Sequence, residues 1–94
     1  MRVRFKNNFT FEIYEGLKLK GVSLELARQS KKKMALVITA TRLDDLRVPP
    51  GNRLEKLEGS RKGQLSIRVN DQWRICFVWK GGQAEEIELC DYHT

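Results

Sequence analysis

The hydrophobic positions near the N-terminus predict a short strand followed by a short helix. Val3 and Phe5 alternate with charged residues, which is the period of a strand. Phe9, Ile13 and Leu17 then recur at intervals of four. This spacing places the three side chains on one face of a helix of about two to three turns.

A second and longer helix is predicted from about residue 24 to residue 40. Ser23 is a good N-cap for it, and Glu25 lies in the first turn, where the helix dipole favours an anion. Residues 41–46 are expected to form a further short helical turn. Pro49 and Pro50 cannot continue it, because neither proline has an N–H group to donate. The apolar positions of the longer helix are Leu24, Ala27, Met34, Val37 and Ile38.

After Gly51 the hydrophobic period changes from that of a helix to that of a strand. A short strand is expected near residues 54–57 and a loop at 59–63. Three alternating segments, separated by tight-turn signals, then form an antiparallel meander over residues 64–69, 73–79 and 84–89. The prediction is one α+β domain (1–94), in which two N-terminal helices pack on a mostly antiparallel sheet of about four to five strands.

The two central strands of this sheet present different faces. The apolar face carries Leu65, Ile67, Val69, Trp73, Ile75 and Phe77. The opposite face presents Ser66, Arg68 and Arg74. If the helices cover the apolar face, the other face becomes a basic concave surface. Such a surface binds phosphate backbones through charge and counterion release.

Composition and charge narrow the range of functions. The chain has 94 residues, which is enough for one small domain. It carries 18 Lys+Arg against 12 Asp+Glu, so its formal net charge is +6. The basic excess lies in residues 1–80, because residues 81–94 contain no Lys or Arg. A small basic domain of this kind points to a polyanionic partner such as nucleic acid.

Several classes of protein are excluded by the same composition. The longest apolar run, residues 34–38, is far shorter than the roughly 20 residues of a membrane span. No secretory signal is visible, and Cys76 and Cys90 are expected to stay reduced. Two cysteines and one histidine exclude a Cys/His zinc site of the usual kind. We therefore expect a cytoplasmic domain with no metal site and no membrane contact.

Five segments of the chain form an ordered set of motifs. Residues 45–59 read DLRVPPGNRLEKLEG, and residues 63–77 read GQLSIRVNDQWRICF. Phe5 and residues 13–16 precede these runs, and Asp91-Tyr92-His93 lies close to the C-terminus. Together they resemble the HigB toxins, which are members of the RelE-like superfamily of bacterial toxin–antitoxin systems. The resemblance covers nearly the whole chain.

This resemblance carries several expectations about fold, activity and partners. It implies a strongly curved RelE-like sheet and a ribosome-dependent, metal-independent endoribonuclease that needs no cofactor. The expected substrate is translated mRNA in the decoding site of the 70S ribosome. The expected protein partner is a cognate HigA-like helix-turn-helix antitoxin, and operator DNA would be contacted only through that antitoxin.

The C-terminal residues offer the groups that metal-free RNA cleavage requires. The reaction deprotonates the 2′-hydroxyl, stabilises the charge on the phosphorane and protonates the 5′-oxygen. His93 is the sole histidine and titrates near neutral pH, so it is the leading acid/base candidate. Asp91 would orient it or share in proton transfer, and Tyr92 would stack on a base or donate a hydrogen bond. Arg74, at the position of an arginine in the superfamily, would stabilise the scissile phosphate.

Further basic residues are candidates for RNA contacts, namely Arg68, Lys56, Arg61, Lys62 and Arg53. Some of them would compensate for departures from the family pattern. Many relatives carry Lys where this chain has Glu58 and an aromatic residue where it has Leu65, and some carry His at Glu55. These departures leave an alternative open. The chain would then be a catalytically weak or silent relative that acts as an antitoxin-bound co-repressor or nucleic-acid-binding module.

Simpler interpretations of the basic residues also remain open. Arg68 and Arg74 would then be cross-strand ion-pair partners of Glu86 and Glu88, since exposed ion pairs are common. The lysines at positions 31–33 are interpreted as a solvated helix face. A generic RNA-binding domain unrelated to toxins has little support, because the chain lacks the aromatic platform of single-strand readers.

Overall fold

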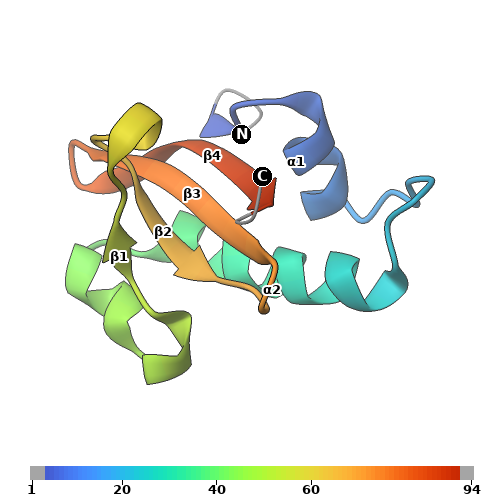
Figure 1. Cartoon of the computed structure of the whole chain (residues 1–94), viewed down its shortest axis with the longest axis horizontal. Helices are drawn as coiled ribbons and strands as arrows, with labels where there is room; N and C mark the ends of the chain where they lie inside the picture. Colours follow the sequence, from blue (N-terminus) through green and yellow to red (C-terminus); the bar gives the residue numbers. More distant parts are fainter. Residues whose placement is uncertain (1–3, 92–94) are drawn as a thin grey trace.

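The computed structural model describes residues 4–91 and confirms the α+β architecture. In this part of the chain, two α-helices precede a four-stranded antiparallel sheet of order β1-β2-β3-β4 (Figure 1). The helices are α1 (Asn8–Tyr14) and α2 (Leu24–Thr39), and the strands are β1 (Glu55–Lys56), β2 (Leu65–Arg68), β3 (Trp73–Lys80) and β4 (Gln83–Asp91). Short 3₁₀ turns are η2 (Leu43–Arg47), η3 (Pro50–Asn52) and η4 (Gly59–Arg61).

The first helix is shorter than its hydrophobic spacing predicts. It begins after Asn7, whose side-chain oxygen accepts a hydrogen bond from the backbone N–H of Thr10 at 2.9 Å. It ends before Gly16, whose φ of 83° lies in the left-handed region. Leu17 therefore lies beyond the helix and is 52% exposed. Of the three positions expected on one helix face, only Ile13 is buried.

The second helix agrees with its predicted bounds. Ser23 is its N-cap, and the hydroxyl oxygen accepts a hydrogen bond from the backbone N–H of Leu26 at 3.0 Å. Met34 and Val37 on the apolar face of α2 are fully buried. The helix packs on β3 and β4, and α1 packs on α2 and β4. The hydrophobic core lies between the two helices and one face of the sheet, as expected.

The N-terminal strand reduces to one bridge within the described residues. Phe5 forms an isolated parallel bridge with Ile87, and Val3 lies outside the described residues. The aromatic side chains of β3 serve in packing, because Phe77 is fully buried and both tryptophans pack against the core. The segment before α1 therefore adds to the edge of β4 without extending the sheet by a full strand.

A β-bulge interrupts the alternation expected for the last strand. The register between β3 and β4 shifts between Cys76 and Val78, so one additional residue of β4 lies opposite β3. Glu86 has a φ of 50°, in the left-handed region. As a result, Ala84 and Ile87 are both fully buried, which strict alternation does not allow. After the bulge, the residues of β4 that point toward the core have the opposite parity from those before it.

Asn52 holds the loop before β1 against α2. It is fully buried, and its Nδ2 donates hydrogen bonds to the carbonyl oxygens of Leu46 and Val48, both at 3.2 Å. Its Oδ1 accepts a hydrogen bond from Nζ of Lys33. The expected solvated face is therefore wrong for Lys33, whose pKa is lowered by burial and then by neighbouring positive charges. The other two lysines of the run are exposed, as expected.

Candidate functional site

A cavity of about 550 Å³ lies beside β1, the η4 turn and the polar face of β3 and β4. In Figure 1, β1 and η4 lie on the left of the view, at the β1 edge of the sheet. The cavity brings together four residues that the sequence singles out as site candidates: Arg74, Asp91, Lys56 and Arg61. Its other ionisable side chains are Glu55, Glu58, Glu88, Cys76 and Cys90.

Arg74 is buried at this cavity and is already bound to several groups. Its Nε donates a hydrogen bond to Oγ of Ser66, and its Nη2 donates one to the carbonyl oxygen of Arg53, both at 2.7 Å. Nη2 also forms an ion pair with Glu55 at 3.0 Å. The expected open basic face is therefore wrong for Ser66 and Arg74, because the segment leading into β1 folds across them. Arg74 fastens β1 to the sheet.

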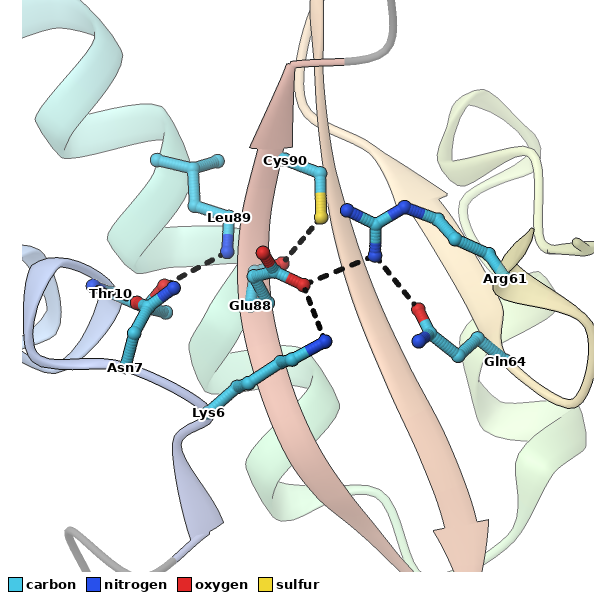
Figure 2. A network of polar contacts seen from close by, with 8 residues as sticks. All are labelled: Lys6, Asn7, Thr10, Arg61, Gln64, Glu88, Leu89 and Cys90. Carbon is cyan, nitrogen blue, oxygen red and sulfur yellow. Dashed lines mark hydrogen bonds and ion pairs between the residues drawn. The ribbon is translucent and has the colours of Figure 1, made fainter. Parts of the chain in front are cut away.

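The second cationic group of the cavity belongs to a network centred on Glu88. Figure 2 shows the Glu88 carboxylate between the side chains of Arg61 and Lys6, with Gln64 beside Arg61. Nη1 of Arg61 lies 3.1 Å from Oε1 of Glu88 and donates a hydrogen bond to Oε1 of Gln64 at 3.0 Å. Nζ of Lys6 lies 3.6 Å from the same carboxylate oxygen.

This network keeps both partners ionised. Burial alone would raise the pKa of Glu88, but the hydrogen bond and charge of Arg61 outweigh it and hold the pKa below its ordinary value. The hydrogen bond to Glu88 in turn raises the pKa of Arg61. Because Gln64 also holds the guanidinium, Arg61 has a fixed position at the wall of the cavity.

Asp91 is the last residue of β4 and lines the cavity. Nε2 of Gln72 donates a hydrogen bond to its Oδ2 at 2.8 Å. Gln72 lies in the β2–β3 turn, which is shaped by Asn70, since Oδ1 of Asn70 accepts from the backbone N–H of Gln72 at 2.9 Å. Tyr92 and His93, the other residues expected at the catalytic centre, lie outside the described residues.

Two free thiols complete the polar wall of the cavity. Cys76 and Cys90 are both buried, and they come from neighbouring strands. The hydrogen bond between them lowers the pKa of Cys76. The same bond and burial raise the pKa of Cys90. Sγ of Cys90 lies 3.7 Å from the carbonyl oxygen of Glu88 and donates a hydrogen bond to it (Figure 2).

The other RNA-contact candidates lie around the cavity and not within it. Lys62 lines a neighbouring hollow that Lys56 also borders. Arg68 forms an ion pair with Asp71 at the β2–β3 turn. Arg53 is exposed. None of these three residues belongs to the lining of the cavity.

The simpler ion-pair interpretation is right about pairing and wrong about partners. Glu88 pairs with Arg61 and Lys6, and Glu86 pairs with Lys80 at 3.8 Å. The arginines of β2 and β3 pair with acids closer to them, in β1 and in the β2–β3 turn. The bulge in β4 and the short strand β1 create these pairings, and neither feature is visible in the periodicity.

Sequence reasoning named Glu88 only as a partner of Arg68 or Arg74 and missed the other contacts that hold the candidates in place. Glu88 and Gln64 fix Arg61, Gln72 fixes Asp91, and Glu55 pairs with Arg74. One signal was available: polar residues alternate with apolar ones at the end of β4. This alternation places Glu88 on the face of the sheet that borders the cavity. The contacts of Gln72 and Glu55 depend on turn geometry, which the pattern does not specify.

The cavity has the composition of a polar site, with four carboxylates and three cations in its lining. Cations suited to phosphate therefore lie beside carboxylates that can accept or donate a proton. Within residues 4–91, no group of three or more His, Cys, Asp or Glu is arranged to hold a metal ion. No helix among the same residues has the length and hydropathy of a membrane span.

Comparison with known proteins connects this geometry to one family. A family model described as "RelE-like toxin of type II toxin-antitoxin system HigB" matches residues 3–93. The protein named Toxin HigB-1 from Vibrio cholerae serotype O1 is 39% identical over 85 residues, which cover 89% of this chain and 90% of the relative. Endoribonuclease HigB from Proteus vulgaris is 34% identical over 91 residues, which cover 85% of this chain and 94% of the relative. The family match includes the cavity and the C-terminal Asp-Tyr-His.

Proposed function

This chain belongs to the HigB family of RelE-like toxins of type II toxin–antitoxin systems, and on that premise we propose that it is a ribosome-dependent endoribonuclease. Its substrate is mRNA under translation on the 70S ribosome, and its reaction uses side chains alone. A relative of similar length carries the name Endoribonuclease HigB, which supports the reaction class. Family membership also implies a cognate antitoxin as its protein partner.

One observation carries the proposal: Asp91 ends β4 at a cavity that also contains Arg74 and Arg61. Two peptide units connect Asp91 to His93, so connectivity alone keeps their Cα atoms within about 7 Å of each other. Tyr92 lies between them in sequence. We therefore assign the cleavage reaction to this cavity, with Arg74, Arg61 and Asp91 in its lining.

Each group receives a role that matches its chemistry. His93 exchanges a proton with the 2′-hydroxyl or the 5′-oxygen, and Asp91, held by Gln72, orients the imidazole or shares in the proton transfer. Tyr92 stacks on a base or donates a hydrogen bond. Arg74 and Arg61, both fixed by carboxylate partners, stabilise the charge that develops on the phosphorane.

The cations around the cavity serve to bind RNA. Lys56 and Lys62 border the hollow beside the cavity, Arg53 precedes β1, and Arg68 is the last residue of β2. Their charge contributes to binding both mRNA and ribosomal RNA, and this contribution falls as salt is added. Operator DNA is contacted only through the helix-turn-helix antitoxin.

The test of this proposal is the loss of cleavage in His93→Ala, with Thr94→Ala as the matched control one residue away. Induced expression of the unaltered chain is expected to stop growth and to yield cleaved mRNA when ribosomes are present. The cleavage rate on isolated ribosomes should fall by about 100-fold or more in His93→Ala, since proton transfer is lost. Unaltered cleavage in that variant, or no cleavage by the unaltered chain, contradicts the proposal.

A second candidate function is favoured by the acids in the cavity. Glu55 and Glu58 line it, and carboxylates outnumber cations there by four to three. These acids repel an RNA phosphate, which supports a catalytically weak or silent co-repressor. Normal antitoxin affinity combined with no cleavage, even at a large molar excess over ribosomes, selects this alternative.

A further inference from the structure

An apolar groove lies between the end of α1, the α1–α2 connection and the start of α2. Its volume is about 550 Å³. In Figure 1 the α1–α2 connection is at the right of the view, while β1 and η4 are at the left. The groove and the cavity share no lining residue.

The walls of this groove expose large aliphatic side chains. Leu17 is 52% exposed and Leu24 is 62% exposed, and Leu19 and Val22 line the same groove between them. A single exposed leucine needs no explanation, but several that converge on one hollow mark a binding surface. Gly16 and Gly21, each with a φ of 83°, set the path of the connection, so the groove is formed in the isolated chain.

The rim of the groove is cationic. Lys18, Arg28 and Lys31 line it, and its lining contains no Asp or Glu. Among the ion pairs within residues 4–91, none involves these three residues. Nζ of Lys31 reaches to 3.9 Å from the position that a Cβ would occupy on Gly16, so its charge extends across the groove toward α1.

From these features we infer that the groove binds an acidic amphipathic segment of the cognate antitoxin. Apolar side chains of that segment pack against Leu17, Val22 and Leu24, and its carboxylates face the three cations. The partner's identity rests on the proposed function. The chemistry of the segment rests on the groove itself.

RNA fits the same surface less well. Phosphates would meet the cations, but the exposed leucines would contribute nothing to backbone binding. Single-stranded RNA is held by stacking on aromatic side chains, and the lining of the groove has none. An acidic peptide uses both the apolar walls and the charged rim, so it is the occupant that the whole surface favours.

The test measures the affinity of the full chain for its antitoxin by isothermal titration calorimetry. Two double variants address the two halves of the surface: Leu17→Ser with Leu24→Ser, and Arg28→Glu with Lys31→Glu. Each is expected to weaken binding at least tenfold, and the charge reversal should also reduce the salt dependence of Kd. All four side chains are exposed, so the variants should unfold at the same urea concentration as the unaltered chain.

Matched controls change similar side chains away from the groove. Val48 is 69% exposed, and Lys80 is an exposed cation in the β3–β4 hairpin. Val48→Ser and Lys80→Glu should each bind the antitoxin within twofold of the unaltered chain. A groove variant that shares the affinity of these controls contradicts the inference.

Two further outcomes separate this inference from the proposed function. If the groove variants keep antitoxin affinity but lose binding to 70S ribosomes, the surface contacts RNA and the inference is overturned. If the unaltered chain binds its antitoxin but cleaves no mRNA, the proposed activity fails while the groove variants still decide the inference. If the unaltered chain does not bind the antitoxin at all, the inference fails together with the proposed partner.

Discussion

The cavity and the groove have the same volume and the same number of cations, but they use those cations differently. In the cavity, Arg74 pairs with Glu55 and Arg61 pairs with Glu88, at 3.0 and 3.1 Å. In the groove, the three cations line a surface with no carboxylate. Two of the three cavity cations are therefore paired within the chain, whereas none of the three groove cations belongs to an ion pair within residues 4–91.

This difference shows that net charge alone does not locate a binding surface. The +6 of the chain suggests a basic face on the sheet, yet the arginine expected at its centre is buried and paired. The cations at the cavity hold its walls in place. Their pairing fixes the positions of Arg74 and Arg61, which is the preorganisation that the proposed reaction requires.

The largest expected effect on stability comes from removing the arginine that fastens β1. Arg74→Met should lower the free energy of unfolding by about 3 kcal/mol, because the buried Oγ of Ser66 and the carbonyl of Arg53 lose their donor. Lys at position 74 keeps the charge but lacks the planar fork of a guanidinium. The free energy of unfolding of Arg74→Lys should therefore lie between those of the unaltered chain and Arg74→Met. Urea unfolding followed by tryptophan fluorescence measures the three chains.

A loss of less than about 1 kcal/mol in Arg74→Met would show that the ion pairs of the cavity do not hold the fold. The contrast between a cavity whose paired cations support the fold and a groove whose cations do not would then no longer hold. The arginine would have to be explained by its role toward RNA alone, and the stability of β1 would have to come from elsewhere.

Most of the fold, but only part of the site, was predictable from the sequence. The long helix and the antiparallel meander follow from periodicity, because apolar burial dominates the choice of element. The end of α1 was not predictable from spacing, since Gly16 stops the helix before Leu17. The bulge at Glu86 was also missed, because it depends on a local backbone conformation and not on the hydrophobic pattern.

The candidate site shows the same division. Arg74 and Asp91 were identified by their place in the motifs, and the structure brings both to one cavity. The partners that fix the site, such as Gln72 and Glu88, depend on contacts between residues far apart in the chain. The alternation at the end of β4 places Glu88 on the polar face, but a single-sequence pattern does not specify which residues it contacts. The role of His93 stays a prediction, because that residue lies outside the described part of the chain.

A smaller effect is expected from neutralising the central acid of the cavity network. Glu88→Gln should cost about 1 kcal/mol at pH 7, because it weakens the bonds to Arg61 and Lys6 at a partly solvated site. The pKa of Glu88 is lowered in the folded chain, so its contribution is complete above the ordinary value of 4.5. The contribution is lost as the pH falls through the lowered pKa.

Urea unfolding of both chains at pH 7 and at pH 3 measures this dependence. The difference in free energy of unfolding between the unaltered chain and Glu88→Gln should be smaller at the lower pH, where the carboxylate takes up a proton. A gap of constant size would mean that Glu88 stabilises the chain by packing and not by charge. Lys80→Gln, which removes an exposed ion pair with Glu86, serves as the control and should show almost no gap.

The smallest effect, and the sharpest contrast with the cavity, is expected at the groove. Arg28 and Lys31 lie three residues apart on α2, so they repel each other in the isolated chain. Arg28→Gln with Lys31→Gln should therefore raise the free energy of unfolding slightly, by about 0.3 kcal/mol at low salt. The gain should vanish near 1 M salt, where screening acts over about 3 Å.

If the double variant is instead destabilised by more than about 0.5 kcal/mol, these cations support the fold and the groove resembles the cavity. A gain that disappears with salt means that the isolated chain keeps two repelling charges on an apolar groove, and an acidic partner would remove that repulsion.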